Sequence, residues 1–171
     1  MKILIAYFSW TDCVAELAGY LCSRLETEAE VLTVRIVPEK KHGYWGWLSL
    51  SFLPGFRTPI QPAVSDLEKY DLVCLGFPKW TLSCPPVNQY ISEMRFQPGK
   101  AFGLFMSFGG FGGERFLENI ARRVGSNGGR IVATASVRRR TLGDGSFRSA
   151  IDRFCRTVLQ AKRADITQPR P

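Results

Sequence analysis

The chain has 171 residues, of which 45% are hydrophobic and 22% charged. This length suits one ordinary domain, and the composition excludes disordered, collagenous and disulfide-scaffold proteins. The net charge of +8 concerns the surface and its partners rather than the fold. A generally basic surface explains it plainly. Nucleic-acid binding is the less favoured alternative, because no recognition module with aromatic residues among basic ones is visible.

Cysteine and histidine content argues against a metal centre. The five cysteines are odd in number and form no C-x-x-C pair, so we expect reduced core thiols. A histidine-based triad or metal cluster would have to be built around His42 alone. The apolar stretch 44–56 is interrupted by glycine and proline and is far shorter than the ~20 residues of a spanning helix. We therefore expect a cytoplasmic protein without a membrane partner.

Five short apolar runs have the length of β-strands. They are residues 2–8, 31–37, 71–77, 101–107 and 130–136. Stretches with the apolar spacing of helices follow four of these runs, at residues 14–25, 87–94, 116–124 and 150–159. This alternation of strands and helices predicts an α/β fold with a doubly wound parallel sheet.

The connection between the second and third predicted strands, residues 39–67, is unusually long. It holds Tyr44, Trp45 and Trp47. This aromatic loop could be a lid over a ligand, a dimer contact, or packing that closes one end of the domain. We expect one domain over residues 1–160 and a frayed or disordered tail over residues 161–171.

In an open α/β sheet, ligands bind beyond the carboxyl ends of the strands. The first strand is followed by Ser9-Trp10-Thr11-Asp12-Cys13-Val14. Hydroxyl groups and free N–H groups at a helix N-terminus can cradle a phosphate, although Thr11 or Asp12 could equally be a simple helix cap.

Two further loops are suited to a flat ligand. Trp80 follows the third strand in a proline-stiffened loop, where its indole could lie against a planar ring or cover the core. The fourth strand is followed by four glycines around Phe111. These glycines allow the backbone to approach a ligand closely, or they form a flexible turn.

Together, the three loops resemble the flavodoxin-like family, in particular its divergent members related to flavodoxins and flavodoxin-type FMN and quinone reductases. The shared motifs are S-x-T at Ser9 and Thr11, G-F-P-K-W followed by P-P-V, and S-F-G-G-F-G-G. The resemblance covers residues 1–160. It implies a three-layer sandwich with a five-stranded parallel sheet in the order 2-1-3-4-5, and flavin mononucleotide (FMN) at the switch point.

The resemblance also assigns site residues by position, and none of them is a catalytic acid or base. The phosphate would be surrounded by Ser9, Trp10, Thr11, Cys13 and Val14. The flavin ring would be flanked by Pro78, Lys79, Trp80 and Thr81. Its other edge would be bordered by Ser107, Phe108, Gly109, Gly110 and Gly113.

The phosphate loop departs from the family at two positions. Asp12 replaces the usual glycine and Val14 the last threonine, which adds a carboxylate and removes a hydroxyl donor. Two functions are therefore weighed. One is an FMN-binding protein for electron transfer, or a small oxidoreductase of the NAD(P)H/quinone reductase type. The other is an interaction module that has kept the fold and lost FMN.

The expected partners follow from the first of these functions. They are a redox partner protein or a small electron acceptor, and a homodimer is possible. Arg138, Arg139 and Arg140 follow the last strand and could attract an acidic partner or an anionic co-substrate, or form a solvated basic face.

Overall fold

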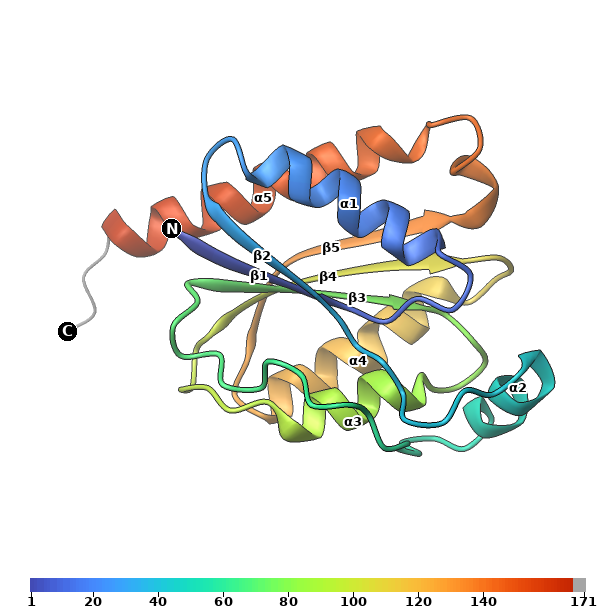
Figure 1. The fold of residues 1–171 in the computed structure, drawn as a ribbon. Coiled ribbons are helices and arrows are strands. Elements are labelled where there is room, and N and C mark those ends of the chain that lie inside the picture. The colour runs from blue at the N-terminus through green and yellow to red at the C-terminus, as the bar shows by residue number, and fades with distance from the viewer. Residues whose placement is uncertain (168–171) are drawn as a thin grey trace.

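The computed structural model describes the backbone of residues 1–167 and the side chains of residues 1–161. Strands and helices alternate along the chain (Figure 1). The strands are β1 (Lys2–Tyr7), β2 (Glu30–Arg35), β3 (Leu72–Pro78), β4 (Ala101–Phe108) and β5 (Arg130–Arg138). The helices are α1 (Cys13–Leu25), α2 (Tyr44–Ser51), α3 (Pro85–Glu93), α4 (Gly113–Ser126) and α5 (Phe147–Thr167), with a short 3-10 turn at Arg139–Thr141.

The five strands form one parallel sheet in the order β2-β1-β3-β4-β5. This confirms the predicted fold class and strand order. Every residue of the central strand β3 is buried. Such continuous burial explains why its sequence is an unbroken apolar run, since a parallel strand is covered on both faces.

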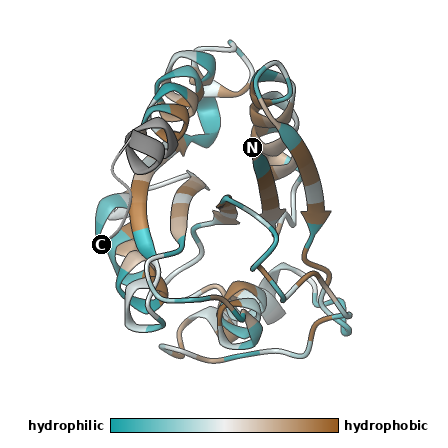
Figure 2. Ribbon diagram, turned by 90° about the vertical axis from the view of Figure 1, so that its left-hand side faces the viewer, coloured by the Kyte–Doolittle hydropathy of each residue, from teal (hydrophilic) through white to brown (hydrophobic). Residues whose placement is uncertain are grey.

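Helices cover both faces of the sheet and create two cores (Figure 1). Successive side chains of a strand point to opposite faces. Ile3 and Ile5 of β1 accordingly pack with α1 and α5, whereas Leu4 and Ala6 pack with α3 and α4. Figure 2 shows the result, with hydrophobic strands between helices whose outer faces are hydrophilic.

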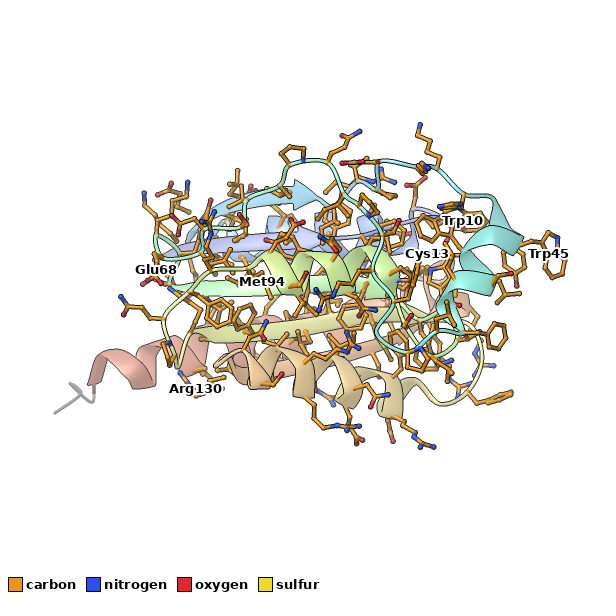
Figure 3. The ribbon with its side chains drawn as sticks, turned by 90° about the horizontal axis from the view of Figure 1, so that it is seen from below. Trp10, Cys13, Trp45, Glu68, Met94 and Arg130 are labelled. Carbon is orange, nitrogen blue, oxygen red and sulfur yellow. The ribbon has the colours of Figure 1, made fainter. Side chains whose placement is uncertain are left out.

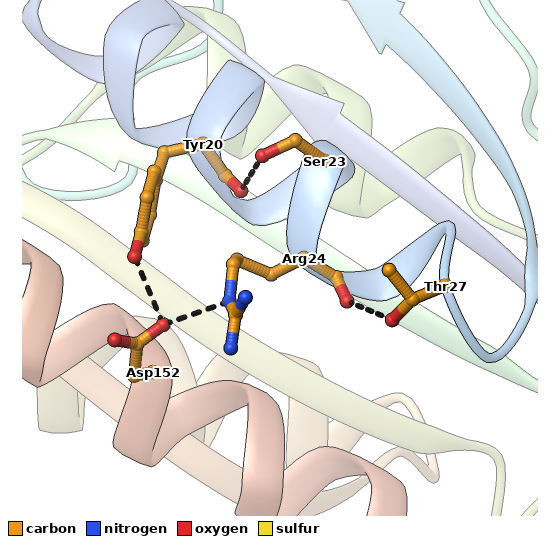
Figure 4. Close-up of polar contacts among 5 residues, drawn as sticks. All are labelled: Tyr20, Ser23, Arg24, Thr27 and Asp152. Carbon is orange, nitrogen blue, oxygen red and sulfur yellow. Dashed lines mark hydrogen bonds and ion pairs between the residues drawn. The ribbon is translucent and has the colours of Figure 1, made fainter.

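A polar contact joins the two helices of one layer. Asp152 on α5 accepts hydrogen bonds from the Tyr20 hydroxyl and from Arg24 Nε, each at 3.0 Å (Figure 4). This contact holds the N-terminal helix against the C-terminal one. It belongs to the scaffold, because the loop after β1 lies at the other end of α1.

The segment 39–67 is not a loop throughout. It contains helix α2, which the sequence analysis did not predict. Apolar residues occupy nearly all sides of α2, so its sequence lacks the one-sided periodicity by which helices are recognised. Trp47 anchors the helix, being 1% exposed and 5.8 Å from the Phe8 ring.

The C-terminal helix extends beyond the expected end of the domain. Helix α5 runs to Thr167, whereas the sequence analysis placed a frayed tail after residue 160. The remainder of that expected tail, residues 168–171, lies outside the described residues. Among residues 1–167, no helix combines the length and apolar character needed to cross a bilayer.

Candidate functional site

The three loops singled out by the sequence lie at one edge of the sheet, because all five strands are parallel. Direct contacts join them. The Trp10 and Trp80 rings, from the loops after β1 and β3, lie 5.3 Å apart. The backbone N–H of Lys79, after β3, donates to the Ser107 carbonyl on β4 at 2.8 Å. The folded chain therefore brings the predicted site residues into one region.

The first loop has the geometry of an anion cradle. The Ser9 hydroxyl accepts a hydrogen bond from the Ala15 N–H at 3.2 Å, and the Cys13 N–H donates to the Thr11 carbonyl at 2.8 Å. Within the described part of the chain, no acceptor is found for the backbone N–H groups of Thr11, Asp12 and Val14. Donors at the positive end of a helix dipole attract anions.

Asp12 occupies a backbone position that explains why glycine is common there. Its φ of 56° places it in the left-handed region, which glycine adopts without strain and aspartate tolerates better than most residues. Its side chain makes no capping hydrogen bond. Asp12 is the N-cap residue by position, as one interpretation of the sequence expected, but the Ser9 hydroxyl accepts the hydrogen bond that caps the helix.

Arg35 offsets the charge of Asp12. Its Nη2 lies 3.3 Å from Asp12 Oδ1 and donates to the Ser9 carbonyl at 2.9 Å. The sequence analysis missed this residue. Strand register provides the signal that could have found it, because Arg35 is the last residue of β2 and pairs with Tyr7 at the end of β1.

Three aromatic rings gather above the loops after β1 and β3. Tyr44, at the start of α2, lies 5.9 Å from both Trp10 and Trp80. The Trp80 Nε1 is buried and has no hydrogen-bond partner among the described residues. Of the three aromatic residues at the start of α2, Tyr44 lies at the candidate site, Trp47 is buried in the core, and Trp45 is exposed to solvent.

The end of β4 provides a second unpaired polar atom. The Ser107 Oγ is buried and lacks a partner within the described residues. Phe108 is half-buried, and the Arg138 guanidinium lies 5.6 Å from its ring. Apart from its chain neighbours, no described residue has an atom within 4 Å of a Cβ added at Gly109 or Gly110, so these glycines leave open space beside the backbone.

Four of the predicted site residues are buried or held by contacts within the protein. The Val14 side chain is 1% exposed and packs in the core, so only its N–H faces the loop side of the site. The Thr81 and Ser51 hydroxyls are hydrogen-bonded at 2.7 Å, which ties the loop after β3 to α2. Pro78 is buried as the last residue of β3, and Gly113 packs closely on Met106 at the start of α4.

A pocket of about 520 Å³ opens beside the first loop, on the β2 side. Phe8 and Trp47 line its apolar part, and Arg35, Lys41 and His42 line its basic part. The His42 ring packs edge-on against Trp47 at 4.9 Å. Within residues 1–161, no group of three or more His, Cys, Asp or Glu side chains could hold a metal ion.

Comparison with solved structures places this geometry in a known fold. A candidate flavoprotein from Bacteroides uniformis aligns with a TM-score of 0.70, is 22% identical, and covers 91% of this chain and 97% of its own. A flavoprotein in complex with FMN from Lactobacillus acidophilus aligns with a TM-score of 0.63, at 15% identity over 84% of this chain and 97% of its own. The chain has the flavodoxin-like fold.

Sequence comparison adds one relative of this flavodoxin-like chain. An uncharacterized protein of Archaeoglobus fulgidus is 29% identical over 114 residues, which is 66% of this chain and 69% of the relative. The chain matches no protein-family model.

Proposed function

We propose that this protein binds FMN between the loops after β1, β3 and β4, and acts in electron transfer or as a small flavin-dependent oxidoreductase. One observation carries the proposal. Backbone donors without acceptors at the start of α1 lie at the same sheet edge as the unpaired Ser107 hydroxyl and Trp80 indole. Unpaired buried polar atoms are rare in proteins and call for a partner, which a ligand can supply.

The residues of the first loop fit the phosphate of FMN. The N–H groups of Thr11, Asp12 and Val14 would donate to it, together with the exposed Thr11 hydroxyl. The Asp12 carboxylate opposes a phosphate, but Arg35 at 3.3 Å offsets that charge. The local charge at this loop therefore opposes phosphate binding less than the sequence alone indicates.

The second and third loops fit a planar ring. The Trp80 indole offers a flat apolar face, and the open backbone at Gly109 and Gly110 would allow close approach from the other side. The Ser107 hydroxyl would supply a hydrogen bond to a polar atom of the ring. Trp10 and Tyr44 would keep water from one side of it.

When bound, FMN would supply the capacity to accept and pass on electrons or hydride. The chain itself would bind and orient the ring and set its exposure to water. No acid or base is needed for this role, and we assign none. The FMN held by the L. acidophilus protein supports the proposal by likeness of fold. A redox partner protein or a small electron acceptor remains the proposed partner, with a homodimer possible.

The proposal is tested by titrating the purified protein with FMN and, separately, with riboflavin, while following flavin fluorescence. We expect saturable quenching by binding, with a clear preference for the phosphorylated form. Failure to bind either flavin would contradict the proposal. It would favour instead an interaction module that has kept the fold, with Asp12 and Val14 marking the lost phosphate site.

A further inference from the structure

The segment 40–57, KKHGYWGWLSLSFLPGFR, forms an unusual surface at the end of the molecule that carries the candidate site. It has basic residues at both ends, no acidic residue, and the uncharged helix α2 in its middle. In Figure 1, α2 extends outward from the body of the domain.

Large apolar side chains on and beside this helix are exposed. Trp45 is 76% exposed and points away from the molecule (Figure 3). Phe52, Leu53 and Leu82 are each more than half exposed. Leu82 belongs to this surface because its N–H donates to the Ser51 carbonyl at 3.0 Å. We call Trp45, Phe52, Leu53 and Leu82 the α2 patch.

Basic side chains that form no ion pair among the described residues border the α2 patch. A groove of about 420 Å³ is lined by Pro54, Gly55 and Leu82 on one side and by Arg122 and Arg123 of α4 on the other. None of the ion pairs found among the described residues involves Arg122 or Arg123. Burial lowers the pKa of Arg123, and the nearby charge of Arg57 lowers it further. Positive charges gathered without counter-ions favour an anionic partner.

We infer that the α2 patch docks the protein onto an anionic lipid surface, with α2 lying in the interface. Exposed tryptophan and other large apolar side chains can enter the boundary between headgroups and acyl chains, and lysine and arginine beside them add attraction to anionic lipids. Lys40, Lys41, Arg57 and the two α4 arginines would contact anionic headgroups. The earlier expectation of no membrane partner rested on the length of a spanning helix, which a helix lying in the interface does not need.

A second copy of this chain suits the surface less well. A two-fold contact through the α2 patch would bring two basic segments together with no acidic residue of segment 40–57 to pair with them. Like charges placed together oppose association. A lipid surface supplies both negatively charged headgroups and an apolar interior. The inference does not depend on FMN binding.

The test is co-sedimentation of the full chain with vesicles of phosphatidylcholine, with and without phosphatidylglycerol. The variant W45S/F52S/L53S keeps every charge, and Leu32→Ser on the exposed edge strand β2 is its matched control. We expect wild type and Leu32→Ser to bind only the anionic vesicles. The triple variant should bind them roughly tenfold or more weakly, since it loses the burial of three apolar side chains.

Tryptophan fluorescence shows whether Trp45 contacts the lipid. This measurement does not require the triple variant to fold. Lipids brominated near the headgroup should quench tryptophan emission in wild type, and much less in Trp45→Phe, because Trp47 is buried and Trp10 and Trp80 lie outside the α2 patch. Equal vesicle binding by wild type and a folded triple variant would show attraction by charge alone and overturn the inference. Absence of binding, or a dimer abolished by the triple variant, would overturn it as well.

Discussion

At the scale of single residues, the pair Asp12 and Arg35 sets the local charge that an anion would meet at the loop after β1. Asp12 is exposed and Arg35 about half exposed, so the pair adds little to stability. Its importance lies in the local charge. Without Arg35, a carboxylate would stand alone at a loop whose other groups are donors.

We predict opposite effects from substituting the two partners. Asp12→Gly removes the carboxylate and suits the left-handed backbone, so it should tighten FMN binding by roughly threefold to tenfold. Arg35→Gln should weaken FMN binding by a comparable factor. Calorimetric titration measures both, and riboflavin is the control because it lacks the phosphate. Equal changes for FMN and riboflavin would contradict a phosphate effect.

Cys13 offers a second, chemical report on the same loop. Cys13 and Cys22 are half-buried, whereas Cys74, Cys84 and Cys155 are buried. Burial raises the pKa of Cys84 to about 12 and that of Cys155 to about 11, so these thiols stay protonated at neutral pH.

We predict that iodoacetamide modifies only Cys13 and Cys22 in the native protein, as read by peptide mass spectrometry. Saturating FMN should slow modification of Cys13 severalfold, because the phosphate would cover the start of α1. Cys22 lies at the other end of that helix and is the internal control. Protection of both thiols, or of neither, would count against a phosphate at this loop.

At the scale of elements, close packing between strands fixes the platform for the loops. Gly76 of β3 lies beneath Phe105 of β4, and a Cβ added there would lie 2.3 Å from the Phe105 ring. Gly19 of α1 contrasts with it, since a Cβ added there would meet no atom of the described residues within 4 Å beyond its own stretch of helix.

We predict that Gly76→Ala lowers the free energy of unfolding by roughly 1–3 kcal/mol, through overpacking of a close-packed core. The control Gly19→Ala should raise it by roughly 0.5–1 kcal/mol, because alanine favours the helix. Urea denaturation measures both. An unchanged midpoint for Gly76→Ala would show that Phe105 can move aside easily.

Strands and most helices were predictable because their patterns are local. The continuous apolar run of β3 indicates burial on both faces. The apolar stripe of α1 indicates burial on one face. Helix α2 was not predictable in this way, since Tyr44, Trp45 and Trp47 are neighbours with three different environments. Only tertiary contacts, such as that of Trp47 with Phe8, decide which ring is buried.

At the scale of the whole molecule, parallel strand order brings three distant loops to one edge. Strand endings and the family motifs predicted which loops meet there. Side-chain contacts between loops were not predictable, as Arg35 with Asp12 and Tyr44 with Trp80 show. Such contacts depend on register and on the path of the segment 39–67 rather than on any local pattern.

The most direct test of the central claim is hydrogen exchange of the whole chain, followed by mass spectrometry with and without saturating FMN. A flavin held by all three loops predicts slower exchange in the peptides around Thr11, Trp80 and Gly110. The peptides of β5 and α5 should exchange equally in both states. Unchanged exchange in the three loops, or protection confined to other parts of the chain, would contradict the proposed site.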